Sequence, residues 1–137
     1  MPGQIGMSQL STILRSAQGG VLIFWCPGCK ESHAIGTGDG PGPRWRWNGD
    51  ATRPTFEPSI KVQGVRAPSG RDVMTDEEEA EYDAIYARGG RAAVFASRFG
   101  TCCHSFVRDG RIQFLDDCSH ELAGQTVDLP AWPARSE

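Results

Sequence analysis

Residues 21–29, VLIFWCPGC, join the most apolar run of the chain to a turn that carries two cysteines. Valine, isoleucine, phenylalanine and tryptophan favour extended backbone, so the run predicts a strand from Val21 to Trp25. The Cys-Pro-Gly-Cys turn that follows directs two sulfur atoms toward one point, which is what a zinc knuckle requires. With a short return strand at residues 32–35, the stretch predicts half of a zinc ribbon.

The size and composition of the chain limit the kind of protein that can contain this knuckle. A chain of 137 residues fits one domain, and such a domain buries roughly two-thirds of its unfolded surface. The 17 glycines and 9 prolines favour turns and short strands over long helices. We therefore expect residues 1–137 to form a single zinc-binding α+β domain, mainly β, with ribbon-like hairpins and one inserted helix.

Charge and hydropathy bear on the partners and the location of the protein. The net charge of −3 gives no overall attraction to a nucleic-acid backbone. No run approaches the roughly 20 apolar residues of a membrane span, and residues 1–20 lack the pattern of a signal peptide. We expect a cytoplasmic protein with no membrane partner.

The five cysteines favour a metal site over a disulfide. In a reducing compartment, a Cys-x-x-Cys pair more often binds metal or does redox chemistry than forms a structural disulfide. A thioredoxin-like redox site would have the pair at the start of a helix, and residues 30–38, KESHAIGTG, predict none. The pair at Cys26 and Cys29 is therefore interpreted as two metal ligands.

Several segments outside the knuckle have weaker patterns. Residues 8–16 are compatible with a helical turn or a short strand, and residues 36–43, GTGDGPGP, predict a loop. Residues 44–47, RWRW, predict a strand that ends at the hairpin signal Asn48-Gly49, with its tryptophans in the core or in the wall of a site.

Proline and capping signals organise the middle of the chain. Residues 53–59, RPTFEPS, predict an extended segment rather than a central strand, and residues 60–65 predict a strand. Residues 75–78, TDEE, form a capping box that predicts a helix ending near Arg88, before Gly89-Gly90. Its acidic face suits a solvated helix that covers a sheet edge or, alternatively, a docking surface.

A second hairpin is predicted around Asp109-Gly110, a strong two-residue turn signal. The turn fixes the register of the flanking strands, residues 103–108 and 111–116. Counting outward gives the pairs Arg108 with Arg111, Val107 with Ile112, Ser105 with Phe114 and Cys103 with Asp116. The segment that leaves the hairpin then carries Cys118 and His120 close to Cys103.

This spacing predicts a second half-site of Cys103 with either Cys118 or His120. Together with the knuckle it completes a tetrahedral centre of three cysteines and one histidine, or of four cysteines, both typical of structural zinc. Cys118 and Cys102 have an alternative role as small, buried apolar residues.

The other two histidines are less suited to this centre. His104 follows Cys103 on a strand, so the two side chains point to opposite faces and cannot share a metal unless the strand bulges. His33 is a candidate ligand, a hydrogen-bond donor to a ligand thiolate, or an ordinary polar residue.

The motifs together resemble a family of short proteins from tailed phages and prophages, which genome annotations sometimes call ammonia monooxygenase. The motifs are CPGCK with His33, WNGD at 47–50, RPTF at 53–56 with Pro58-Ser59, CHSFV at 103–107 with DG and IQF, and His120 with LAGQTV at 122–127. The resemblance covers roughly residues 21–65 and 101–131, and residues 66–100, with the predicted helix, look like an insertion. It implies His120 as the fourth ligand, because relatives often have serine or threonine at the position of Cys118.

The monooxygenase label implies copper and a membrane, whereas the chain has neither an apolar span nor a histidine-rich copper site. We instead expect a phage-type accessory or interaction protein of a bacterial host's cytoplasm, with a host or phage protein as partner and Zn²⁺ held by Cys26, Cys29, Cys103 and His120.

Two alternative functions remain open at this point. The first is a zinc hydrolase with an open metal position and His33, His104 or Glu57 as general base, although the chain lacks the His-Glu-x-x-His and deaminase motifs. The second is a zinc ribbon that binds nucleic acid through residues 44–47. No catalytic residue is assigned.

Overall fold

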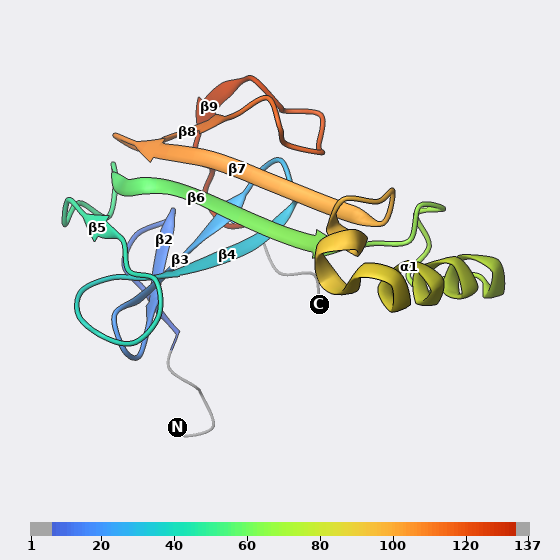
Figure 1. Ribbon diagram of the computed structural model, residues 1–137. Helices are drawn as coiled ribbons and strands as arrows, with labels where there is room; N and C mark the ends of the chain where they lie inside the picture. Colours follow the sequence, from blue (N-terminus) through green and yellow to red (C-terminus); the bar gives the residue numbers. More distant parts are fainter. Residues whose placement is uncertain (1–6, 134–137) are drawn as a thin grey trace. The chain divides into compact units, whose positions relative to one another are not determined.

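The computed structural model describes residues 7–133 and is mainly β, as the sequence predicts (Figure 1). Two antiparallel sheets and one helix make up the described part of the chain. The strands are β1 (Ser8–Gln9), β2 (Leu14–Ala17), β3 (Val21–Cys26), β4 (Glu31–Gly36), β5 (Arg46–Trp47), β6 (Phe56–Val65), β7 (Gly100–Arg108), β8 (Arg111–Phe114) and β9 (Thr126–Asp128), and the helix is α1 (Asp76–Phe95).

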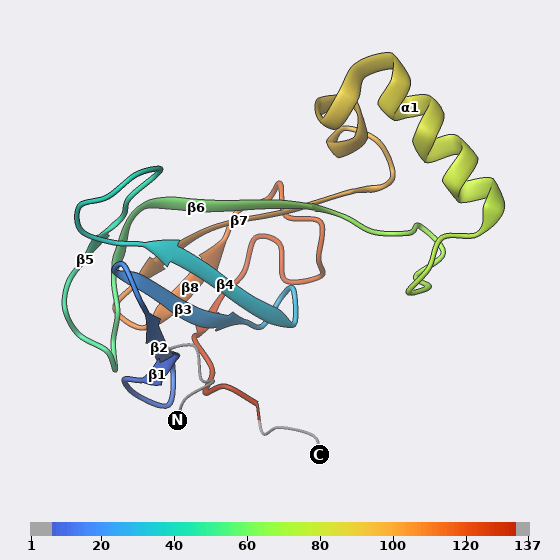
Figure 2. The same ribbon diagram turned by 90° about the horizontal axis from the view of Figure 1, so that it is seen from below.

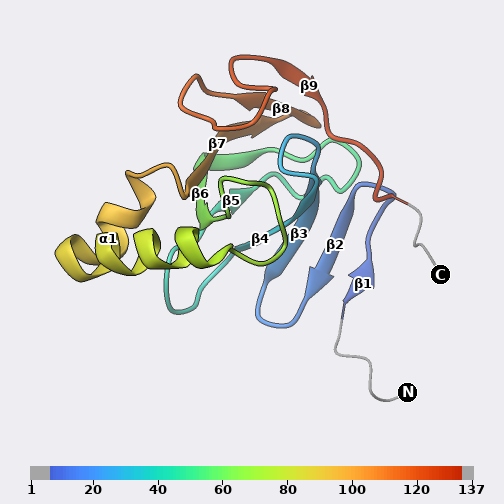
Figure 3. The ribbon, with the colours of Figure 1, turned by 90° about the vertical axis from the view of Figure 1, so that its right-hand side faces the viewer.

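The first sheet has the strand order β1-β2-β3-β4, and these strands lie side by side in Figure 3. Burial alternates along β3, because successive side chains of a strand point to opposite faces, and Leu22, Phe24 and Cys26 face the core. The predicted strand and its return partner are confirmed, with Phe24 opposite His33. The undecided residues 8–16 contain β1 and the start of β2.

The second sheet has the order β5-β6-β7-β8-β9. Its β7–β8 hairpin has the predicted register from Arg108 opposite Arg111 to Ser105 opposite Phe114. Asp109 and Gly110 both have positive φ, 54° and 80°, as a tight hairpin turn with the right twist requires. The predicted strand end at Asp116 is wrong, because β8 stops at Phe114.

Two predictions for residues 44–59 are also wrong. Asn48-Gly49 does not close a two-residue hairpin, since Trp47 pairs with Phe56 across an eight-residue loop. Side-chain caps hold that loop, with Asn48 Oδ1 accepting the N–H groups of Asp50 and Thr55 at 3.1 Å each. Residues 56–59 form the start of a strand that lies between β5 and β7, where Pro58 follows a cis peptide bond.

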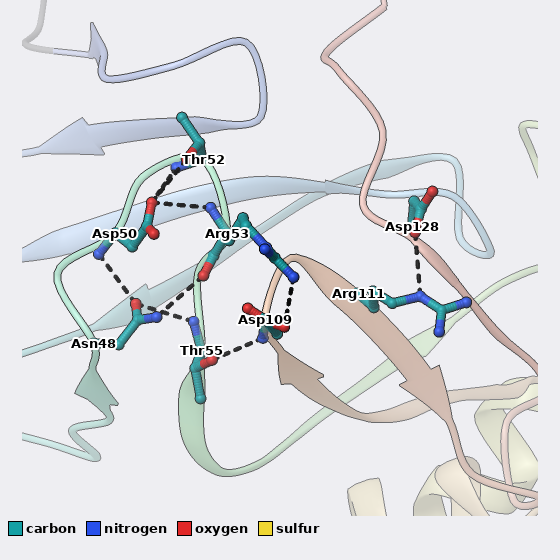
Figure 4. Close-up of polar contacts among 8 residues, drawn as sticks. All are labelled: Asn48, Asp50, Thr52, Arg53, Thr55, Asp109, Arg111 and Asp128. Atoms are coloured by element: carbon teal, nitrogen blue, oxygen red, sulfur yellow. Dashed lines mark hydrogen bonds and ion pairs between the residues drawn. The ribbon is translucent and has the colours of Figure 1, made fainter.

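A polar network ties the start of β6 to the β7–β8 turn (Figure 4). Thr55 Oγ1 accepts the Asp109 N–H at 2.7 Å, and the Arg53 guanidinium lies 2.7 Å from the Asp109 carboxylate. The Gly110 N–H also donates to the Pro54 carbonyl at 2.9 Å. These contacts join β6 to β7 at one end, which matters because both strands carry residues of the candidate site.

Side chains of the two sheets meet in one core, and the ribbons of Figures 1 and 2 show the two sheets as facing layers. Phe24 of the first sheet stacks on Phe56 of the second at 6.2 Å between ring centroids, and both side chains are fully buried. Burying an aromatic side chain of this size contributes about 1.5–3 kcal/mol to the free energy of unfolding. Cys26 and Cys103 are buried in the same core.

The chain divides into two compact units, one formed by residues up to Ile60 and from Cys103 onward, the other by Lys61–Cys102. The second unit has its own apolar cluster of Ile85, Val94 and Phe99. Thr75 caps α1 in a complete capping box with Glu78, as predicted. The helix runs beyond Arg88 and is interrupted at Gly90, whose φ of 65° and ψ of −155° are not helical.

In the described range, 7–133, no helix combines the length and apolarity that crossing a bilayer needs. The single-domain organisation of residues 1–137 and the status of residues 66–100 as an insertion stay predictions.

Candidate functional site

The first candidate site is a cluster of Cys26, Cys29, Cys103 and His120, in which one ligand atom of each residue lies within 4.8 Å of the others. The Sγ atoms of Cys26 and Cys103 are 3.8 Å apart. Two sulfurs bound at about 2.3 Å to one tetrahedral zinc are separated by about 3.8 Å. The thiols of Cys26 and Cys103 thus already have the spacing of two ligands of one tetrahedral zinc. The three cysteines come from β3, the turn that follows it and β7.

The backbone of the knuckle fits the same purpose. The Cys29 N–H donates to Cys26 Sγ at 3.3 Å, and the Lys30 N–H donates to the Cys26 carbonyl at 2.8 Å. Lys30 has a φ of 59°, which reverses the chain. A Cβ atom on Gly28 would overlap the His120 imidazole, so only glycine lets this ring lie over the turn.

His120 has one nitrogen that the protein leaves without a partner. Nε2 is buried and makes no hydrogen bond to the described residues, whereas Nδ1 accepts the Leu122 N–H at 3.2 Å. A buried, unsatisfied polar atom is costly, and a metal bond would remove that cost. A neutral imidazole bound through Nε2 carries its proton on Nδ1, so Nδ1 could then no longer accept the Leu122 N–H.

The thiols also influence each other's protonation. The hydrogen bond from Cys103 lowers the pKa of Cys26 well below its ordinary value, and the same bond raises the pKa of Cys103. Without a cation, neighbouring thiols resist losing more than one proton because like charges repel. A divalent cation reverses this effect, since it favours the thiolate form of every ligand.

The other predicted ligand candidates lie outside this cluster. Cys118 is buried but does not belong to it, so the structure brings His120 and not Cys118 to the three thiols. His33 is buried, and its Nε2 makes no hydrogen bond within residues 7–133. Its ring packs edge-on against Phe24, with 5.7 Å between the ring centroids. It also lies within ligand distance of Cys29 and Glu31, a set that shares Cys29 with the first cluster.

A second candidate site consists of Ser59, His104 and Asp117. His104 Nε2 lies 3.1 Å from Ser59 Oγ, and His104 Nδ1 lies 3.1 Å from an Asp117 carboxylate oxygen. A serine, a histidine and an aspartate in this order have the geometry of a catalytic triad. The His104 side chain is 24% exposed and that of Asp117 50%, so solvent reaches the site.

The fold explains why these three residues meet. Ser59 lies on β6 and His104 on the neighbouring strand β7, while Asp117 lies in the segment that follows β8. Along β7 the side chains of Cys103 and Ser105 are buried and that of His104 is not, which confirms that Cys103 and His104 point to opposite faces. One strand therefore supplies a residue to each candidate site.

The backbone of His104 is held by Cys118. Cys118 Sγ accepts the His104 N–H and donates to the His104 carbonyl, both at 3.2 Å. The same carbonyl accepts the Leu115 N–H at 2.9 Å. Since β8 ends at Phe114, the Cys118 thiol makes the hydrogen bonds to the His104 backbone that a neighbouring strand would otherwise make.

The triad was not predicted from the sequence. His104 entered only as a base for a metal hydrolase, and Ser59 and Asp117 were assigned no chemical role. The available signal was indirect, since Pro58-Ser59 and Cys103-His104 both lie in motifs shared with the resembled family. Ser59 lies 45 positions from His104, and Asp117 lies 13 positions from it. No local sequence pattern shows that these residues meet.

The comparisons with known proteins point to a family of bacterial proteases. A family model described as "Bacterial ubiquitination-like system serine protease (BubE)" matches residues 1–115, which include Ser59 and His104 as well as the three clustered thiols, and end before Asp117 and His120. No curated protein and no solved structure matches the chain.

Proposed function

Since the chain belongs to the family of bacterial ubiquitination-like system serine proteases, BubE, we propose that it cleaves acyl bonds of polypeptides with Ser59 as nucleophile. The main support for this proposal is the chain of hydrogen bonds from Ser59 Oγ through both ring nitrogens of His104 to Asp117. This site supports a hydrolase better than a non-enzymatic interaction protein or a nucleic-acid-binding ribbon. The substrates are proteins of a ubiquitination-like system.

In the proposed reaction, Ser59 Oγ forms a bond to the carbonyl carbon of the substrate while His104 Nε2 takes the serine proton. Asp117 accepts the Nδ1–H of His104, which fixes the tautomer and stabilises the imidazolium. His104 then gives the proton to the leaving group as the acyl bond breaks. Water releases the acyl group from Ser59 by the same steps, again with His104 as base.

Labelling with a fluorophosphonate probe tests the nucleophile without a known substrate. Ser59 should displace fluoride and gain the phosphonyl mass, and His104→Ala should slow this labelling by at least about 10³-fold. Ser32→Ala, which removes an exposed serine of β4, is the matched control and should label normally. Labelling that persists in Ser59→Ala, or never occurs in the folded wild type, would contradict the proposal.

For the cysteine cluster we propose a structural Zn²⁺ held by Cys26, Cys29, Cys103 and His120. Three thiolates and an imidazole fill a tetrahedral shell, which leaves no position for a reactive water. Zinc would supply fold stability, on the order of 10 kcal/mol, and no step of the acyl transfer. This separates the metal from the chemistry, unlike the open zinc hydrolase considered above.

The metal ligands and the triad alternate along the same backbone segments. Cys103 precedes His104 on β7, and His120 follows Asp117 by three residues. A bond from one ion to Cys103 and His120 would therefore fix the distance between the strand of the base and the segment of its carboxylate. Phage or prophage origin, a cytoplasmic location and a host or phage partner protein remain predictions.

A further inference from the structure

A groove lies beside the candidate nucleophile in the first unit. It has a volume of about 480 Å³ and is lined by Thr37, Gly38, Asp39 and the four residues Arg44–Trp47. Trp45 connects it to the triad, because its indole N–H donates to the Ser59 carbonyl at 3.1 Å. In Figure 2 the loop between β4 and β5, drawn in cyan to teal, curls beside β5 and the start of β6.

The Arg44 guanidinium is the centre of the hydrogen bonds in this loop. The guanidinium donates four of its five N–H groups to backbone carbonyls. Two go to the Pro41 carbonyl, one to that of Gly19 and one to that of Thr37. Gly40 leaves room for it, since a Cβ there would overlap Nη2. These partners are neutral carbonyls, so no carboxylate among the described residues balances the charge, and one Nη2 donor remains unused.

Arg46 adds a second cation to the groove. Its side chain is 83% exposed, and its one ion pair among the described residues is a loose 3.5 Å contact with Glu57. Asp39 is the one acidic residue of the lining. The lining therefore has a net charge of +1, on a protein whose overall charge is −3.

Trp45 and Trp47 give the groove flat apolar walls between these charges. Aromatic walls bind an extended chain by its backbone and its aliphatic parts, while the cations select among side chains. The groove is open, as a site for a segment of a larger polypeptide must be. Its lining suits an extended chain, and the hydrogen bond from Trp45 to the Ser59 carbonyl joins one wall of the groove to the backbone of the candidate nucleophile.

We propose that this groove binds an extended segment of the protein substrate next to the bond cleaved at Ser59, and that it selects an acidic side chain there. The inference rests on the proposed function, because it assumes that Ser59 is the reacting group. Arg46 would act as the specificity-determining residue, and Arg44 would supply the fixed part of the positive potential.

Binding measured without catalysis tests the groove by itself. The probes are fluorescein-labelled, C-terminally amidated octapeptides of Gly, Ala and Ser, each with a single Glu at a different position. The Ser59→Ala protein is titrated with each peptide, and binding is followed by fluorescence anisotropy. One position should bind about fivefold tighter with Glu than with Gln, and weaker again with Lys, as an exposed charge contact allows. Added salt should reduce the difference.

Matched variants locate the effect. Arg46→Ala should remove the preference for Glu, whereas Arg111→Ala, which deletes the same charge from β8 outside the groove lining, should keep it. Arg44→Lys keeps the charge but loses the planar set of donors that holds the loop. This variant should bind every peptide more weakly while its circular dichroism spectrum shows that the protein stays folded.

Three outcomes overturn the inference. They are equal binding of the Glu, Gln and Lys peptides, a preference that survives Arg46→Ala, and selection of a free C-terminal carboxylate with no effect of internal Glu. Each is independent of fluorophosphonate labelling, so the groove can fail while Ser59 still reacts. Loss of labelling with intact peptide selection would instead contradict the proposed chemistry.

Discussion

At the scale of single residues, Cys118 is the most informative side chain outside the two candidate sites. Its thiol both accepts from and donates to the backbone of His104, and it is buried. A residue that holds the base in place acts on the rate through position, since even small displacements of a catalytic group are costly. In the proposed mechanism, Cys118 would therefore be a positioning residue for His104.

We expect Cys118→Ala to lower the rate constant of fluorophosphonate labelling about tenfold to hundredfold, because the His104 backbone loses two contacts. Cys118→Ser keeps a donor and an acceptor and should restore most of the rate. Zinc content measured by mass spectrometry should be the same in both variants. Equal labelling by the alanine and serine variants would refute the positioning role.

Glu78 gives a pH-dependent prediction at the same scale. Hydrogen bonding to the Thr75 backbone N–H, and then to Ser69, lowers the pKa of Glu78 below its ordinary 4.5. A carboxyl with a lowered folded pKa stabilises the fold fully above its unfolded pKa and loses this contribution as pH falls through the folded value. The helical circular dichroism signal should therefore fall below about pH 4.5 as α1 is destabilised. In Glu78→Gln the signal should depend less on pH.

The start of α1 can be tested at neutral pH as well. Thr75 Oγ1 accepts the Glu78 N–H at 3.1 Å, so Thr75→Ala leaves a helix donor unsatisfied. The free energy of unfolding should fall by about 1 kcal/mol in urea titrations. Thr75→Ser keeps the oxygen and should lose much less, and an unchanged midpoint for Thr75→Ala would show that the cap contributes nothing.

At the scale of elements, the hairpin β7–β8 and the knuckle after β3 act together. Cys103 and the knuckle thiols come from different sheets, and the 3.8 Å sulfur distance makes their contact part of the core. In the segment after β8, Cys118 bonds to the backbone of β7, and the His120 ring packs edge-on against Phe114 at 4.5 Å between ring centroids. A metal at this point would order the same segment that carries Asp117.

We expect His120→Ala to reduce the bound zinc of the purified protein, because it removes the fourth ligand, and Cys118→Ser to retain it. Gly28→Ala should also reduce zinc, since the added methyl group displaces the His120 ring. Metal content by mass spectrometry and the melting temperature measure both effects. Loss of zinc from Cys118→Ser, with full zinc in His120→Ala, would mean that Cys118 is the ligand.

At the scale of the whole molecule, the two compact units have separate sources of stability. The first contains the cysteine cluster, while the second depends on its own apolar cluster and on the ion pair of Arg98 with Glu81 at 2.7 Å. Units with separate cores open independently in hydrogen exchange.

Removing metal with a chelator should therefore speed amide exchange in β3, β7 and residues 115–124, and leave α1 protected. Mass-spectrometric exchange with and without added Zn²⁺ measures this difference, and the His120→Ala protein is the control that should not respond to zinc. Equal exposure of α1 on chelation would show that one cooperative unit, and not two, depends on the metal.

The sequence by itself determined the local parts of this protein. The strand before the knuckle, the Asp109-Gly110 turn with its register, and the Thr75 cap follow from contacts between residues a few positions apart, whose geometry a short stretch fixes. It also indicated the cluster of Cys26, Cys29, Cys103 and His120, because a hairpin register carries Cys103 toward the segment of His120.

Only the tertiary structure decided the triad. Ser59 meets His104 because β6 and β7 are neighbours in one sheet, joined at one end by the Thr55–Asp109 contact. No local pattern fixes the pairing of strands so far apart in sequence. Asp117 reaches His104 because β8 ends early and Cys118 turns the chain back onto β7. Side chains from three separate segments then converge, and that convergence depends on packing energies summed over the whole core.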